Sequence, residues 1–219
     1  MLDAYVTPVG DFGAAVAARL AERYDIRTAA PPEIADSSRW PDARVHVVAA
    51  WRETPALFDL ADRYAFITRR PWLPVALDAT SLRVGPLVAG DAGPCYRCYL
   101  GRQFQHRRLR GNDRELFARY DADPACGVAG FLTAHVSLAA LATGLCLDAA
   151  AAGRIDGERG RARRFALLSP QLSVSMVVPV DGCDRCGLRD PDATWRDLAR
   201  DLAGIPAAKP AAAAGWRSR

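Results

Sequence analysis

Four cysteines in two C-x-x-C pairs are the clearest chemical signal in this sequence of 219 residues. Cys95 and Cys98 lie in GPCYRC, and Cys183 and Cys186 lie in DGCDRCG, far along the chain. Each C-x-x-C turn directs two thiolates towards one ion, and two such turns complete the tetrahedral four-sulfur shell that zinc prefers. We therefore predict one structural zinc ion held by all four cysteines.

Two other interpretations of these pairs are a redox dithiol and unconnected surface thiols. The proline or glycine beside each pair favours zinc, because it suits the tight turn that a metal knuckle needs. Two cysteines stay outside this assignment. Cys146 lies in an apolar helical segment and is predicted to pack in the core, whereas Cys126, just before Gly127, stays unassigned, with an exposed and reactive thiol as one interpretation.

A short glycine turn follows the first apolar run of the chain. Gly10 and Gly13 lie in GDFG, directly after residues 5–9, and a helical pattern comes next. A strand, a G-x-x-G turn and a helix are typical of a phosphate-binding turn. Asp11 and Phe12, however, stand where a pyrophosphate would approach the backbone. We predict a vestigial nucleotide turn at Gly10 and Gly13, and we assign no catalytic residue.

The elements that must position these residues alternate between strand and helix over the first 90 residues. Continuous apolar runs predict buried parallel strands, and 3.6-residue periodicity predicts the helices between them. The predicted strands are 5–9, the piece around Ile26, 44–51, 71–77 and 82–88, and the predicted helices follow 10–13 and span 55–68. This pattern indicates a doubly wound α/β domain.

The second half is predicted to hold helices at 112–120 and 127–152, then strands at 163–168 and 172–180. The segment 127–152 is almost uncharged and rich in alanine and glycine. A membrane span is conceivable for it, but a central helix packed on a sheet or at a dimer interface explains small residues equally well. We predict the packed helix.

Composition indicates a globular protein, with 50% hydrophobic and 25% charged residues and a net charge of +4. The first residues lack the basic region of a secretory signal, so we expect a cytoplasmic protein with reduced cysteines. Two segments, 102–110 and 154–164, are rich in arginine. They can bind phosphate or an acidic peptide, although solvated loops beside a helix explain them more simply.

The order of these motifs resembles a known superfamily. A Rossmann-like sheet, VGPLVAGDAGPCYRCYLGRQ, a buried Ala/Gly helix and PVDGCDRCG together resemble the ThiF-like adenylyltransferases, which include ubiquitin-activating enzymes. The closer resemblance is to the ThiF-like partner proteins of YcaO cyclodehydratases in thiazole/oxazole-modified microcin and thiopeptide pathways. It covers residues 1–190 and implies a ThiF-type α/β domain with zinc knuckles. We expect 191–206 to form a C-terminal helix and 207–219 to be a disordered tail.

The resemblance also implies partners. In that family, the partner protein recruits the leader region of a ribosomally made precursor peptide and activates a YcaO enzyme, which uses ATP to make azolines. We therefore expect this chain to bind a precursor peptide and a YcaO-type cyclodehydratase, and to form a homodimer. The sequence shows no fused winged-helix module to clasp the leader, so we also expect a separate leader-clasping protein.

Departures from the superfamily argue against catalysis. An active adenylyltransferase needs an aspartate after the middle strand to hold magnesium, but here Trp51 and Arg52 follow, with Glu53 one residue further on. We therefore expect a non-catalytic scaffold that does not use ATP. One alternative is an enzyme that adenylates a peptide C-terminus, with Glu53 replacing the aspartate.

A second alternative is a zinc-stabilised protein that binds nucleic acid. Only the arginine segments support it, and they lack the interleaved aromatic residues that stack on bases. We accordingly expect neither a nucleic-acid partner nor a membrane partner.

Overall fold

The computed structural model describes residues 3–30, 33–78, 80–106, 111–123 and 130–187. All of these belong to the compact unit Met1–Leu188, and the second unit, Arg189–Arg219, lies outside the described residues. The predicted helix at 191–206 and tail at 207–219 therefore stay predictions.

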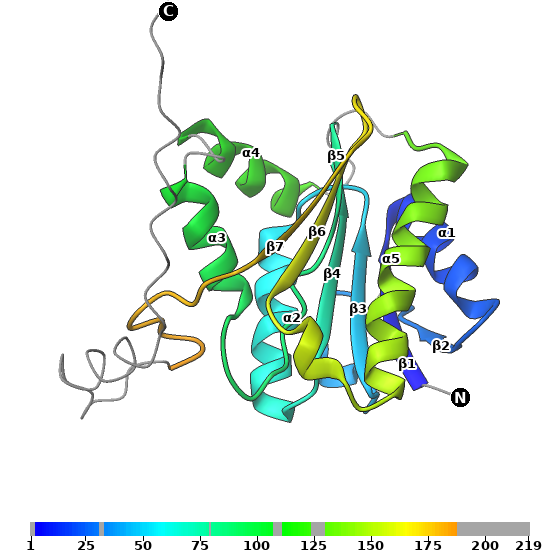
Figure 1. Cartoon of the computed structure of the whole chain (residues 1–219), viewed down its shortest axis with the longest axis horizontal. Coiled ribbons are helices and arrows are strands. Elements are labelled where there is room, and N and C mark those ends of the chain that lie inside the picture. Colours follow the sequence, from blue (N-terminus) through cyan, green and yellow to red (C-terminus); the bar gives the residue numbers. More distant parts are fainter. Residues whose placement is uncertain (1–2, 31–32, 79, 107–110, 124–129, 188–219) are drawn as a thin grey trace, which may run out of the picture. The chain divides into compact units, whose positions relative to one another are not determined.

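A seven-stranded mixed sheet forms the centre of the described unit (Figure 1). Its strand order is β2-β1-β3-β4-β5-β6-β7. The first four strands in this order are parallel, and the remaining pairings are antiparallel. In chain order the strands are β1 (Asp3–Val9), β2 (Asp25–Thr28), β3 (Val45–Ala50), β4 (Trp72–Leu77), β5 (Ser81–Val84), β6 (Arg161–Ala166) and β7 (Gln171–Met176).

Helices cover both faces of this sheet. On one face lie α1 (Gly10–Ala21) and α5 (Thr133–Ala151), and on the other lie α2 (Pro55–Thr68), α3 (Tyr96–Gln105) and α4 (Gly111–Ala122). Strands β3 and β4 are buried along their whole length, as expected for parallel strands covered on both faces. The sequence prediction of an α/β protein is confirmed in these terms.

Two hydrophobic cores result, one on each face of the sheet. The core under α1 and α5 is mainly aliphatic, with Phe12, Leu20, Leu73, Leu82 and Leu147 among its largest members. The core under α2 and α3 is aromatic, and its members include Phe58, Trp72, Tyr96 and Tyr99. The rings of Phe58 and Tyr96 meet edge to face, with centroids 5.5 Å apart.

Several predicted boundaries agree with the structure and others do not. Helix α2 has the predicted bounds 55–68, whereas strand β5 ends at Val84, before Gly85, whose φ is +98°. Helix α5 begins at Thr133, and part of the predicted segment 127–152 lies outside the described residues. Helix α3 was not predicted, because its sequence YRCYLGRQFQ mixes a metal knuckle with basic residues and has no clear apolar stripe.

The small-residue helix α5 is long and apolar enough to cross a membrane by length and composition alone. In the structure it packs against α1 and β5, and Val136, Ala139 and Leu147 lie in the core. This packing explains its small residues and confirms the predicted packed helix.

Candidate functional site

The four cysteines of the C-x-x-C pairs come together at one point. The Sγ atoms of Cys95 and Cys98 lie 3.7 Å apart, and the pairs Cys95–Cys183 and Cys98–Cys186 lie 3.5 Å apart. All four Sγ atoms lie within 4.8 Å of one another. These separations are too long for a disulfide, whose S–S bond is about 2.05 Å. They match the edge of about 3.8 Å that a tetrahedron with metal–sulfur bonds of about 2.3 Å requires, so the cluster can hold a metal ion.

Local structure fixes each pair of thiols. Cys95 is the N-cap residue of α3, and Cys98 lies in the first turn of that helix. The backbone N–H of Val180 donates to the Cys98 Sγ at 3.3 Å. On the second pair, the N–H of Gly187 donates to the Cys183 carbonyl at 3.0 Å, which closes a tight turn.

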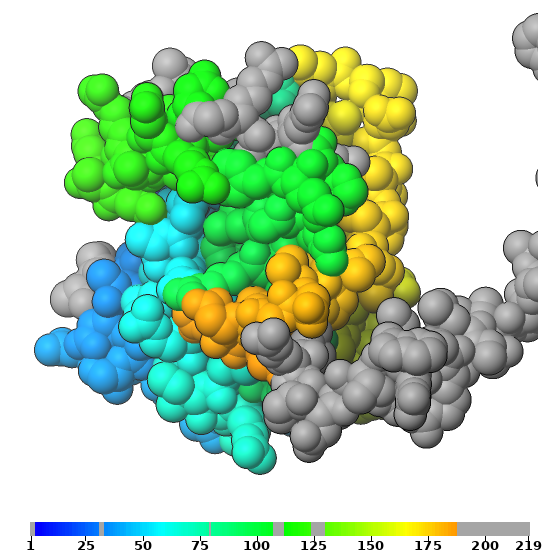
Figure 2. All heavy atoms as spheres, turned by 90° about the vertical axis from the view of Figure 1, so that its left-hand side faces the viewer, coloured from blue at the N-terminus to red at the C-terminus, as the bar shows by residue number. Residues whose placement is uncertain are grey.

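Ion pairs centred on one carboxylate attach the cluster to the rest of the domain. The Asp59 carboxylate on α2 accepts from Arg97 at 2.8 Å and from Arg185 at 3.1 Å, so both knuckles are tied to the same helix. Arg97 also pairs with Asp184 at 2.5 Å. Figure 2 shows the segment 177–187, in orange, lying against α3 and α2.

Burial raises the pKa of the Cys95 thiol well above its usual range, and it raises the pKa of Cys186 to about 12. These thiols are therefore protonated at neutral pH until an ion replaces the protons. Metal binding at this site must release protons, so the affinity for a metal falls as the pH falls.

The Trp51 indole packs against Gly10 of the predicted nucleotide turn. Gly10 has a φ of +68°, and a Cβ atom on it would lie 2.8 Å from the Trp51 indole. Gly13 is buried in α1, and a Cβ atom there would overlap the Ala49 carbonyl of β3. Both glycines thus have packing roles in this chain, one at a left-handed turn and one at a close contact between helix and strand.

A stack of side chains extends from this turn. The Arg52 guanidinium lies 3.1 Å from the Trp51 ring centroid and 4.3 Å from the ring centroid of Tyr120 on α4. Arg52 is buried, at 5% exposure. The stack occupies the carboxyl ends of β1 and β3, which is where the strand order reverses and where open α/β sheets usually bind ligands.

Glu53, the acid considered as a replacement for a magnesium ligand, is engaged within the protein. Its two oxygens accept from Arg83 on β5 at 2.8 and 2.6 Å, and the Tyr96 hydroxyl donates to it at 2.5 Å. The side chain of Arg83 is only 3% exposed. The pair is therefore a buried ion pair with satisfied hydrogen bonds, and it braces β5 against the loop after β3.

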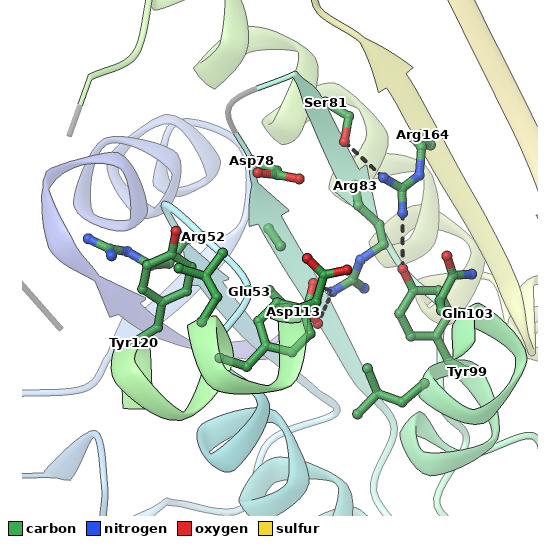
Figure 3. Close-up of a pocket in the computed structure, with 14 residues that line it drawn as sticks. Arg52, Glu53, Asp78, Ser81, Arg83, Tyr99, Gln103, Asp113, Tyr120 and Arg164 are labelled. Carbon is green, nitrogen blue, oxygen red and sulfur yellow. Dashed lines mark hydrogen bonds and ion pairs between the residues drawn. The ribbon is translucent and has the colours of Figure 1, made fainter. Parts of the chain in front are cut away.

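A cavity of about 400 Å³ lies beside this pair. In Figure 3, Arg83 and Arg164 extend into it from β5 and β6, and Tyr99 and Gln103 face it from α3. The Arg164 guanidinium donates to Ser81 Oγ at 2.9 Å and to the Tyr99 hydroxyl at 3.1 Å. The cavity is thus lined by hydrogen-bonding groups and aromatic rings, which suits a polar ligand.

Sequence reasoning missed Arg83 and Arg164 as members of this cavity. Arg164 lies in the arginine segment 154–164, for which we favoured solvated loops, and also in the predicted strand 163–168; the structure places it in strand β6. Because Arg161, Ala162 and Arg163 show no apolar face, the predicted strand began two residues too late.

The remaining single residues have structural roles. Cys146 is 1% exposed in the aliphatic core, which confirms its predicted packing role. His46 is 1% exposed among aromatic rings. The His135 Nδ1 accepts the Leu132 N–H at 3.2 Å near the start of α5. Cys126 lies outside the described residues.

No protein-family model and no curated protein matches the chain. Solved structures do share its fold. The heterocyclase TruD aligns with 84% of this chain and 27% of its own, with a TM-score of 0.60 and 18% sequence identity. A heterocyclase in complex with substrate and cofactor aligns with 84% of this chain and 25% of its own, with a TM-score of 0.59 and 16% identity.

A third structure, Escherichia coli MccB with ATP, aligns with 84% of this chain and 67% of its own, with a TM-score of 0.59 and 13% identity. The chain thus spans about a quarter of the heterocyclases that it resembles and two thirds of MccB. At these identities the likeness is one of fold.

Proposed function

We propose that this protein is a non-catalytic accessory protein in ribosomal peptide natural-product biosynthesis. It binds a precursor peptide, a YcaO-type cyclodehydratase or both, and it supports azoline formation by that enzyme. The single observation that carries the non-catalytic part is the contact of the Trp51 indole with Gly10 in the predicted nucleotide turn. The likeness in fold to a heterocyclase and to MccB supports the peptide-biosynthesis part.

Zinc is the metal proposed for the four-cysteine cluster. Four thiolates at tetrahedral separations form a closed shell with no open position for water or substrate. When bound, the ion would join Cys95 and Cys98 to Cys183 and Cys186 and would perform no hydrolysis. A homodimer and a cytoplasmic location belong to the same proposal, and light scattering of the purified chain tests the first of them.

The test reconstitutes the reaction from purified components. A purified YcaO-type cyclodehydratase is incubated with its precursor peptide and ATP, with and without this chain, and water loss from the peptide is followed by mass spectrometry. We expect dehydration to depend on this chain. We also expect this chain alone, with precursor and ATP, to give no pyrophosphate exchange.

The competing function is adenylation of a peptide C-terminus. One observation favours keeping this function in the test: the cavity beside Glu53 is lined by both arginines and carboxylates, including Arg164, Asp78 and Asp113. Pyrophosphate exchange by this chain that is lost in Glu53→Gln would establish the enzyme and end the accessory proposal. Dehydration that proceeds equally well without this chain would also contradict the accessory role.

A further inference from the structure

Strand β7 is an edge strand without the usual protection against further pairing. Among the described residues it pairs only with β6, and it forms one of the two edges of the sheet, opposite β2 (Figure 1). All six of its residues, QLSVSM, are exposed, and none is charged or proline. Proteins normally protect such edges with charges, prolines or bulges, so a long uncharged edge is suited to pairing with another strand.

The register shows which backbone groups point outwards. Val177 N–H donates to the Gly160 carbonyl at 2.8 Å, and the pairing continues as Arg163 opposite Val174. Because hydrogen-bonded and non-hydrogen-bonded pairs alternate in an antiparallel ladder, every second residue of β7 points its N–H and C=O away from β6. Those residues are Leu172, Val174 and Met176.

The two faces beside this edge differ in chemistry. The side chains of Leu172, Val174 and Met176 share one face and are 54–58% exposed, which makes an apolar stripe. On the other face, a groove of about 570 Å³ runs between β7 and α3 and is lined by Arg102 and His106. No acidic residue is among the described residues that line it.

Arg102 places positive charge along the α3 side of this edge. It donates to the carbonyls of Val178 and Pro179 at 3.1 and 2.7 Å and to the Gln105 side chain. Within the described part of the chain, Arg102 has no carboxylate partner, so the groove is complementary to an acidic ligand.

We propose that β7 binds an extended acidic peptide as an added strand. Its backbone pairs with the outward groups of Leu172, Val174 and Met176. Alternate side chains of an added strand point to opposite faces, so acidic residues lie towards Arg102 while apolar residues lie on the stripe. This inference rests on the proposed function and names the peptide site within it.

The test uses two fluorescein-labelled ten-residue peptides, one alternating glutamate with valine and one alternating lysine with valine. Fluorescence anisotropy with the full chain is expected to show binding of the glutamate peptide at least about tenfold tighter than the lysine peptide. Val174→Pro removes one outward N–H without removing a hydrogen bond to β6, so it should abolish binding. The matched control, Val174→Thr, keeps the N–H and should bind within about threefold of the unmodified protein.

A second measurement holds even if the proline variant does not fold. Amide exchange by NMR on the unmodified protein should slow at Leu172, Val174 and Met176 when the glutamate peptide is added. The amides of Ser173 and Ser175 already bond β6, so their exchange should change little. Arg102→Gln should keep binding but lose most of the preference for glutamate over lysine.

Three outcomes would overturn the inference. The first is binding of the glutamate peptide by Val174→Pro as tight as by the unmodified protein. The second is amide exchange that the peptide does not slow at every second residue of β7. The third is a dimer of the unmodified protein that Val174→Pro converts to a monomer. The last would assign the edge to a second copy of the chain. If Val174→Pro still binds the natural precursor, the edge assignment fails and the accessory role stands. If the unmodified protein binds neither the precursor nor the cyclodehydratase, the proposed function itself fails.

Discussion

At the scale of single residues, Trp51 changes what the glycine turn can do. A G-x-x-G turn after a strand is compatible with phosphate binding and with close packing, and sequence alone does not separate the two. Here the indole of Trp51 lies where a side chain on Gly10 would be, and Arg52 stacks on it. This contact exists only in the folded protein, so sequence alone does not reveal it. The prediction that the turn no longer binds a nucleotide is tested by measuring nucleotide binding to the purified chain.

Glu53 gives the first stability prediction. Glu53→Gln leaves the buried Arg83 without its carboxylate, and removal of one partner from a buried pair costs about 3–5 kcal/mol. Urea unfolding should show this loss. The double variant Glu53→Gln with Arg83→Met removes both charges and should recover most of the stability. Equal stability of Glu53→Gln and the unmodified protein would contradict the pairing.

His46 gives a prediction for pH dependence. Burial lowers its pKa from 6.5 to about 4, so the folded state resists protonation. Below pH 6.5 the unfolded chain takes up a proton that the folded chain does not, and stability falls as the pH drops from about 6.5 to about 4. The loss attributable to His46 is about 3 kcal/mol. His46→Leu should remove this part of the curve, and identical pH profiles of both proteins would contradict it.

At the scale of elements, the contact between α1 and β3 depends on Gly13. A methyl group at Gly13 would overlap the Ala49 carbonyl, so α1 would have to move off the sheet. Gly13→Ala should therefore destabilise the protein by about 2–3 kcal/mol, despite the better helix propensity of alanine. Gly157→Ala is the matched control, because nothing lies within 4 Å of its added Cβ, and it should change stability by less than about 0.5 kcal/mol. Equal unfolding midpoints for the two variants would contradict this packing role.

The predictability of each element followed its local pattern. Helix α2 has a proline at its start and a regular apolar stripe, and its bounds were predicted in full. Strand β6 was shifted by two residues, because its first residues are arginines whose partners, such as Glu158, are known only from the fold. Helix α3 was missed, since its buried face consists of Tyr96, Cys98 and Tyr99 and not of a leucine-rich stripe.

At the scale of the whole molecule, the four cysteines were predictable and the cavity was not. Each C-x-x-C pair predicts two metal ligands from its spacing alone. Only the proximity of the two pairs in the folded protein had to be inferred. The cavity draws Arg52 from the end of β3, Arg83 from β5 and Arg164 from β6, and no local pattern links them. Such sites depend on antiparallel register between distant segments, which sequence periodicity does not encode.

The four-cysteine cluster joins distant parts of the chain, and its disruption gives the last prediction. Cys183→Ser should abolish binding of the proposed zinc ion and free the segment 177–187 from α3. Arg185, whose side chain is 9% exposed beside Asp59, should then become a trypsin site. A loss of about 3 kcal/mol corresponds to a fall in Tm of roughly 6–12 °C for a domain of this size. Metal analysis, calorimetry and timed proteolysis measure these effects, and chelation of the unmodified protein should reproduce them.

Cys146→Ser is the matched control, since Cys146 lies in the core away from the cluster, and it should keep its zinc. A Cys183→Ser protein that keeps one zinc per chain and resists trypsin would show that the cluster does not join these segments.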